Sequence, residues 1–99
     1  MTLFRWDENK AASNLHKHGI KFEAAIKVFE DDFVITERDR VIDGEWRWRS
    51  IGMVEGLTIL LVAHTICESD RDEIIRIISA RKATRHESTN YPERARHGK

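Results

Sequence analysis

The sequence is poor in cysteine and in long apolar segments, and each shortage excludes a class of protein. A single cysteine, Cys67, excludes a disulfide bond within the chain and favours a reducing compartment. The longest uninterrupted apolar run, Ile59–Ala63, is far too short to cross a bilayer. The chain also begins without the apolar stretch of a signal peptide. We therefore expect a cytoplasmic protein that does not bind membranes.

Motifs for metal or cofactor binding are also missing. Five histidines are present, but His16 and His18 are only two residues apart near the end of a predicted helix, so their side chains point to different sides. The chain has no H-E-x-x-H, no C-x-x-C and no glycine-rich phosphate loop. No serine or cysteine lies in a recognisable nucleophile elbow. We expect neither a metal nor a cofactor.

Net charge is also absent, although the charges are unevenly distributed. The chain has 17 Lys and Arg residues against 17 Asp and Glu residues. Residues 7–32 carry six acids and four lysines, whereas residues 80–99 carry six Lys or Arg and two Glu. This polarity predicts a basic face that holds a polyanion, and a solvated basic tail is the alternative.

The 99 residues are enough for one domain, 1–99, in which residues 92–99 are expected to form a flexible tail. Asp7 is a favourable helix N-cap, and Gly19 can end that helix after His18. A second apolar stripe with helical spacing follows directly: Phe22, Ala25, Ile26 and Phe29. The N-terminal part is therefore predicted to be a helical hairpin.

Strand-like segments fill the middle of the chain. The predicted strands are Phe33–Glu37, Trp46–Val54, Leu57–Thr65 and Glu73–Ala80. A charged loop is expected over residues 38–45, and a C-terminal helix is expected from Arg81, interrupted or ended by Pro92. The predicted fold class is α+β, with an N-terminal helical hairpin, a mainly antiparallel four-stranded sheet and a C-terminal helix.

Arg76 lies inside the apolar run of the last strand. A buried arginine must be paired or must face a binding site, because an isolated buried charge is costly. An ion pair with Glu73 or with an acid across the sheet is one interpretation, and anion binding is the other. Strict alternation places four residues on one face: Ile74, Arg76, Ile78 and Ala80.

Other residues suit RNA. In Trp46-Arg47-Trp48-Arg49, alternation puts both tryptophans on one face and both arginines on the other, either as core and solvated surface or as an RNA site. His64 is either structural or a proton-transfer group. Cleavage of RNA without a metal needs a base, an acid and cations for the phosphate charge. Arg47, His64, Arg76 and Arg81 could supply them if they converge.

Several blocks occur in one order and together resemble the BrnT family of toxins from type II toxin–antitoxin systems. The resemblance covers residues 4–91. The blocks are Phe4-x-Trp6-Asp7-Glu8-x-Lys10, Asn14-x-x-Lys17-His18-Gly19-Ile20-x-Phe22-Glu23-x-Ala25, Val28-Phe29-x-Asp31, Arg47-Trp48-x-x-Ile51-Gly52, His64-Thr65 and Ile75-Arg76-Ile77-Ile78-Ser79-Ala80-Arg81-Lys82-Ala83-Thr84.

The resemblance implies a RelE-like fold and a ribonuclease that inhibits translation and growth. A BrnA-type antitoxin would be the partner, and operator DNA would be contacted only through that antitoxin. We hypothesise a metal-independent endoribonuclease that leaves 2′,3′-cyclic phosphate ends. The residues expected to be catalytic are His64, Arg76, Arg81 and Arg47. Those expected to bind RNA are Arg49, Lys82, Arg85 and Tyr91, the last of which is otherwise a core residue. The candidates for the base are His64, His18, Lys17 and Glu68.

Two departures from the family pattern support an alternative function. Many relatives have Thr-x-Arg after the central strand, whereas this chain has Thr65-Ile66-Cys67. The segment after Glu87 is also less basic than the common arginine-rich version. The alternative is a weakened or inactive toxin homologue that serves as an antitoxin-binding module or co-repressor.

Overall fold

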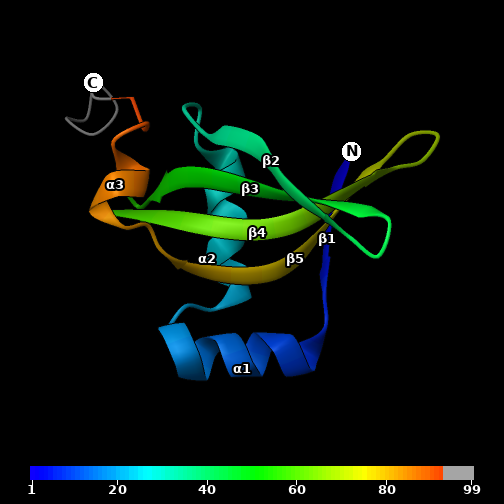
Figure 1. Cartoon of the computed structure of the whole chain (residues 1–99), viewed down its shortest axis with the longest axis horizontal. Helices are drawn as coiled ribbons and strands as arrows, with labels where there is room; N and C mark the ends of the chain where they lie inside the picture. Colours follow the sequence, from blue (N-terminus) through cyan, green and yellow to red (C-terminus); the bar gives the residue numbers. More distant parts are fainter. Residues whose placement is uncertain (93–99) are drawn as a thin grey trace.

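Five strands form one mixed sheet in the computed structural model, which describes residues 1–92 (Figure 1). Their order across the sheet is β1-β5-β4-β3-β2. The β1–β5 pair is parallel, and the other three pairs are antiparallel. The strands are β1 (Thr2–Trp6), β2 (Ile35–Ile42), β3 (Glu45–Val54), β4 (Thr58–Glu68) and β5 (Glu73–Lys82).

The helices are short. α1 (Glu8–His18) begins after Asp7, whose carboxylate accepts hydrogen bonds from two backbone amides, and it ends at Gly19 with a φ of 71°. Both ends agree with the prediction. α2 (Phe22–Ala25) continues as a 3-10 helix, η1 (Ile26–Glu30), and α3 (Arg85–Ser88) is a single turn.

The predicted fold class is wrong in its arrangement. The N-terminal residues form a strand that adds to the far edge of the sheet, so the sheet has five strands and one parallel pair. α1 and α2 do not form a hairpin, and they run in different directions in Figure 1. The short segment Thr2–Trp6 lacks a strict alternation of polar and apolar residues, and its partner lies about seventy residues away, where no local signal points to it.

The predicted loop over residues 38–45 is also wrong. Most of it is paired strand, and the turn itself is only Asp43-Gly44, with φ values of 52° and 77°. Such positive φ values at both central residues belong to the tight turn that matches strand twist. Charged residues are tolerated in β2 because it is an edge strand and one residue, Asp39, is bulged.

The C-terminal helix is shorter than predicted. β5 runs on to Lys82, so Arg81 and Lys82 belong to the strand rather than to a helix. Thr84 then caps α3, and its hydroxyl accepts a hydrogen bond from the Glu87 amide. Apart from Pro92, the predicted flexible tail lies outside the described residues.

The main core lies between the sheet and the segment α2–η1. Phe22, Val28, Val62 and Ile77 are completely or almost completely buried there. β3 approaches η1 so closely at Gly52 that a Cβ atom would lie 2.9 Å from the Val28 side chain. The absence of a side chain at this position therefore lets the two elements pack directly. We call this side of the sheet the helix-covered face.

An irregularity in β5 changes the side-chain pattern of that strand. Ala63 pairs with Ser79 while His64 pairs with Ile77, so Ile78 has no partner in β4. Ile75, Ile77 and Ala80 all enter the main core, which strict alternation would not allow. The predicted shared face of Arg76 and Ala80 is therefore wrong, because the bulge places Arg76 with Arg81 on the opposite side.

A smaller apolar cluster covers one end of that opposite side. Ile51, Leu61 and Tyr91 form its buried part. The Tyr91 hydroxyl donates a hydrogen bond to Asp31, whose carboxylate also accepts from the backbone amides of Met53 and Phe33. Burial raises the pKa of Asp31, but these three hydrogen bonds outweigh it and hold the pKa below its usual value.

Asn14 connects α1 to β5 beyond the end of β1. Its amide nitrogen donates to the carbonyls of Ile20 and Ala80, at 2.9 Å each, and its oxygen accepts from the Ala80 amide at 3.0 Å. The last β1–β5 pair is Trp6 with Ile77. The side chain of Asn14 thus takes the place of a neighbouring strand for a backbone that would otherwise be buried without partners.

We expect Asn14→Ala to lower the free energy of unfolding by about 2–4 kcal/mol, because it leaves the polar backbone of Ala80 unpaired. Asn9→Ala, on the exposed surface of the same helix, should change it by no more than about 0.5 kcal/mol. Urea denaturation of both variants measures the difference. Equal effects would show that the Asn14 contacts are not stabilising.

Candidate functional site

The sheet face opposite α2–η1 carries most of the predicted arginines, and we call it the open face. The register pairs Arg49 with Ala63, Thr65 with Arg76, and Leu61 with Arg81 across adjacent strands. Side chains of paired residues in a sheet point to the same side. Arg47, Arg49, Arg76 and Arg81 therefore all lie on the open face.

A carboxylate joins two of these arginines. Glu45 Oε1 accepts hydrogen bonds from Arg47 Nη1 at 3.2 Å and from Arg76 Nη2 at 2.9 Å. The two arginines come from β3 and β5, with β4 between them. Arg76 thus has the ion pair across the sheet that was one of its two interpretations, with Glu45 rather than Glu73. About half of each of the side chains of Arg76 and Glu45 is exposed.

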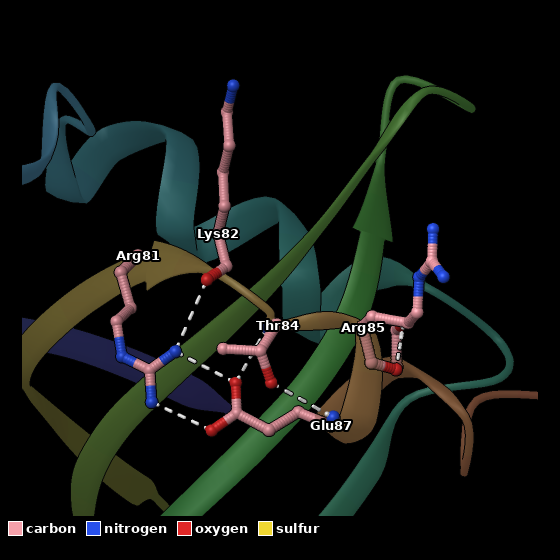
Figure 2. Close-up of polar contacts among 6 residues, drawn as sticks. Arg81, Lys82, Thr84, Arg85 and Glu87 are labelled. Atoms are coloured by element: carbon pink, nitrogen blue, oxygen red, sulfur yellow. Dashed lines mark hydrogen bonds and ion pairs between the residues drawn. The ribbon is translucent and has the colours of Figure 1, made fainter.

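Arg81, at the end of β5, forms an ion pair with a different carboxylate, that of Glu87 (Figure 2). Its two terminal nitrogens donate to the two oxygens of Glu87, each at 2.8 Å. These hydrogen bonds raise the pKa of Arg81 and lower the pKa of Glu87 to about 2. The pair is the bidentate type, which fixes both side chains. Arg81 lies about 13 Å along the strands from the row of Arg76.

Of the other basic residues predicted to bind RNA, only Arg49 lies with the arginines of the open face. Arg49 Nη2 lies 3.5 Å from Glu37 Oε1 on the open face. Lys82 and Arg85 are exposed, and in Figure 2 their side chains lead away from the Arg81–Glu87 pair. The structure therefore does not bring Lys82 and Arg85 together with Arg47 and Arg76.

His64 is separated from the arginines by the sheet itself. Its ring is completely buried on the helix-covered face, with the centroid 5.0 Å from that of Phe29. Nε2 shares a hydrogen bond of 2.8 Å with Ser50 Oγ, which in turn contacts Thr36 Oγ1 at 2.8 Å. Burial lowers the pKa of His64. His64 therefore does not converge with Arg76 and Arg81, which was the condition for their acting together.

The aromatic residues also lie away from the arginines of the open face. Tyr91 is only 2% exposed and belongs to the second apolar cluster, so its ring offers no stacking surface. Trp46 and Trp48 lie on the side opposite Arg47 and Arg49, as alternation predicts. There the guanidinium of Arg38 lies 4.8 Å and 5.4 Å from their ring centroids.

Within residues 1–92, no group of three His, Cys, Asp or Glu side chains is placed to hold a metal ion. No helix in this part of the chain is long and apolar enough to cross a membrane.

Comparison with known proteins places the chain in a family. Residues 6–87 match the model of the ribonuclease toxin BrnT of type II toxin–antitoxin systems. The chain belongs to the BrnT family of ribonuclease toxins. It is also similar to the crystal structure of the Brucella abortus ribonuclease toxin BrnT, with 27% identity and a TM-score of 0.61, over 86% of this chain and 99% of that one. No curated protein matches it. The resemblance inferred from the sequence blocks is confirmed, and membership of this family implies a protein antitoxin.

Sequence reasoning missed Glu45, which touches both central arginines of this BrnT-family chain. It was assigned to a loop, whereas it is the first residue of β3. Its position two residues before Arg47 would have placed both side chains on one face, had the strand been extended. The contact with Arg76 depends on the order of the strands, which no local pattern reveals.

The buried histidine predicts a pH-dependent stability. The pKa of His64 is lowered in the folded state, whereas the unfolded chain has the ordinary value of 6.5. The unfolded state therefore binds more protons as the pH falls below about 6.5, and the free energy of unfolding should decrease there. Urea denaturation at about pH 7.5 and about pH 5.5 measures this change.

His64→Gln should remove most of this pH dependence, while His16→Gln, at an exposed site on α1, should retain it. An unchanged pH dependence in the His64 variant would assign the effect to other groups.

Proposed function

We propose that this chain is a metal-independent endoribonuclease whose active site is the cluster of Glu45, Arg47 and Arg76 on the open face. The observation that carries the proposal is the convergence of two arginines from separate strands on one carboxylate. A guanidinium has five N–H donors, and Glu45 uses one from each arginine. Donors therefore remain on both side chains for the oxygens of a phosphodiester.

The cluster suits cleavage by the neighbouring 2′-hydroxyl of RNA. Glu45 accepts the proton of that hydroxyl while the 2′ oxygen attacks phosphorus. Arg47 and Arg76 stabilise the additional negative charge of the phosphorane. The bond to the 5′ oxygen then breaks, and this oxygen takes a proton from water. The hydroxide that remains takes the proton from Glu45 and restores its carboxylate. The products are a 2′,3′-cyclic phosphate and a free 5′-hydroxyl.

The other predicted catalytic residues, His64 and Arg81, take no part in this chemical step. His64 is too deeply buried to reach a phosphate on the open face. Arg81 and Arg49 lie farther along the same face, where they would contact the RNA backbone. This division leaves Glu45 as the base, in place of His64, His18, Lys17 and Glu68.

The biological setting follows from the family. RNA cleavage by this chain would inhibit translation and growth until a BrnA-type antitoxin covers the open face. Operator DNA would then be bound by the antitoxin and only indirectly by this chain. The site of action would be the cytoplasm.

One observation favours the alternative of an inactive, antitoxin-binding homologue. Cys67 pairs with Ile74 and follows Thr65 on the open face, so an arginine at this position would lie beside the cluster. The cysteine removes that cation. The alternative predicts an antitoxin complex without RNA cleavage by the free chain.

Induction of the chain without its antitoxin should arrest growth. The purified protein should cleave single-stranded RNA in the presence of EDTA and leave 2′,3′-cyclic phosphate ends, identified by mass spectrometry. Intact RNA over a range of substrates, together with normal growth, would refute the nuclease proposal and favour the binding module.

Glu45→Gln should reduce the cleavage rate roughly 10²–10⁴-fold, the usual contribution of a general base, without weakening RNA binding. Arg76→Ala should reduce the rate by about 10²-fold or more. Because the ion pair is half exposed, both variants should unfold within about 1 kcal/mol of the parent. Glu68→Gln is the matched control and should cleave normally. A loss of activity in Glu68→Gln and not in Glu45→Gln would contradict the assignment of the base.

A further inference from the structure

The open face carries arginines beyond the proposed active site. Arg40 of β2 pairs in register with Arg47 of β3, and Arg5 of β1 pairs with Arg76 of β5. Thr65 pairs with Arg76 and completes the row in β4. The row crosses all five strands in the order Arg40, Arg47, Thr65, Arg76 and Arg5.

The two outer arginines are compensated less well than the central ones. Arg47 and Arg76 share Glu45. Arg40 Nε lies 3.4 Å from the carboxylate of the adjacent Asp39, its one ion pair within residues 1–92, and its side chain is 68% exposed. Arg5 is exposed and has no ion pair or side-chain hydrogen bond with any of residues 1–92.

Like charges in register on neighbouring strands destabilise a sheet. Arg5 beside Arg76 and Arg40 beside Arg47 are such pairs. An anion lying over each pair would remove the repulsion. The row therefore favours a ligand that brings several negative charges to evenly spaced positions.

The dimensions suit a phosphodiester chain. Neighbouring strands are about 4.8 Å apart, so a row over five strands is about 19 Å long. The backbone of a single-stranded nucleic acid carries one charge per nucleotide and can lie along such a row. Arg47 and Arg76 flank the middle of the row and Glu45 lies beside them, so RNA would be bound on both sides of the cleaved bond.

We propose that Arg40 and Arg5 extend the active site into a phosphate-binding row for single-stranded RNA that crosses the strands from β2 to β1. The inference rests on the proposed function, which makes RNA the ligand. It adds two binding residues and the path of the substrate over the sheet.

The test compares two double variants that remove equal charge. Arg5→Gln with Arg40→Gln alters the ends of the row, and Lys10→Gln with Lys17→Gln alters exposed positions on α1. Fluorescence anisotropy measures their binding to 2′-O-methyl oligonucleotides of about two and about eight nucleotides, which cannot be cleaved. Site sizes of small single-strand-binding domains begin at about four nucleotides, so only the longer probe can reach both ends.

The Arg5 and Arg40 double variant should bind the longer probe about tenfold more weakly. The slope of the logarithm of its binding constant against the logarithm of salt concentration should become less steep by roughly 1.4, which corresponds to two phosphate contacts on a single strand. Its affinity for the dinucleotide should be unchanged. The lysine double variant should bind both probes within about twofold of the parent. An equal loss in both double variants, or an equal loss for both probes, would overturn the row.

The outcomes separate this inference from the proposed function. Cleavage by the parent together with normal binding by the arginine double variant would refute the row alone. Length-dependent binding without cleavage by the parent would refute the nuclease and support the row. A double variant that loses its protein antitoxin but binds RNA normally would assign the row to the protein partner and overturn the inference.

Discussion

One extra residue in β5 determines which side chains share the open face. The core between the sheet and α2–η1 requires Ile75 and Ile77 on the helix-covered face, and it also takes Ala80. An odd separation between Ile77 and Ala80 is possible only because Ile78 is bulged out of register. The same bulge turns Arg81 to the side of Arg76. The same bulge therefore allows the apolar core to pack and places Arg81 on the open face.

Four arginines of the open face, Arg47, Arg49, Arg76 and Arg81, each lie against a carboxylate. Glu45 binds Arg47 and Arg76, Glu37 lies near Arg49, and Glu87 binds Arg81. These pairs explain how a chain of zero net charge could hold the proposed polyanion, because each carboxylate orients a guanidinium that has further N–H donors. The exposed pairs contribute little to stability, so their value lies in orientation. The Arg81–Glu87 pair also ties α3 to the end of β5.

Local signals in the sequence located many of the helices and strands but not the order of the strands across the sheet. The cap at Asp7 and the end at Gly19 follow from the conformational preferences of single residues, and the structure has both. The identity of β1 could not be predicted, because its partner is distant in sequence and a parallel pair has no connecting turn to reveal it. The bulge at Ile78 could not be predicted either, because the sequence of apolar residues around it is compatible with a regular strand and with a bulged one. Arg47 and Arg76 were found as charges within strands, whereas Glu45 required the three-dimensional neighbourhood, and His64 was misplaced because a strand-end histidine can point to either side.

The most direct test is the response of the arginine side chains to RNA. NMR spectra of the Nε–Hε groups would be recorded during titration with a 2′-O-methyl oligonucleotide. RNA bound on the open face should shift the signals of Arg47 and Arg76 and leave that of Arg38, on the other face, unchanged. Shifts confined to Arg38, with Arg47 and Arg76 unaffected, would contradict the open face as the site.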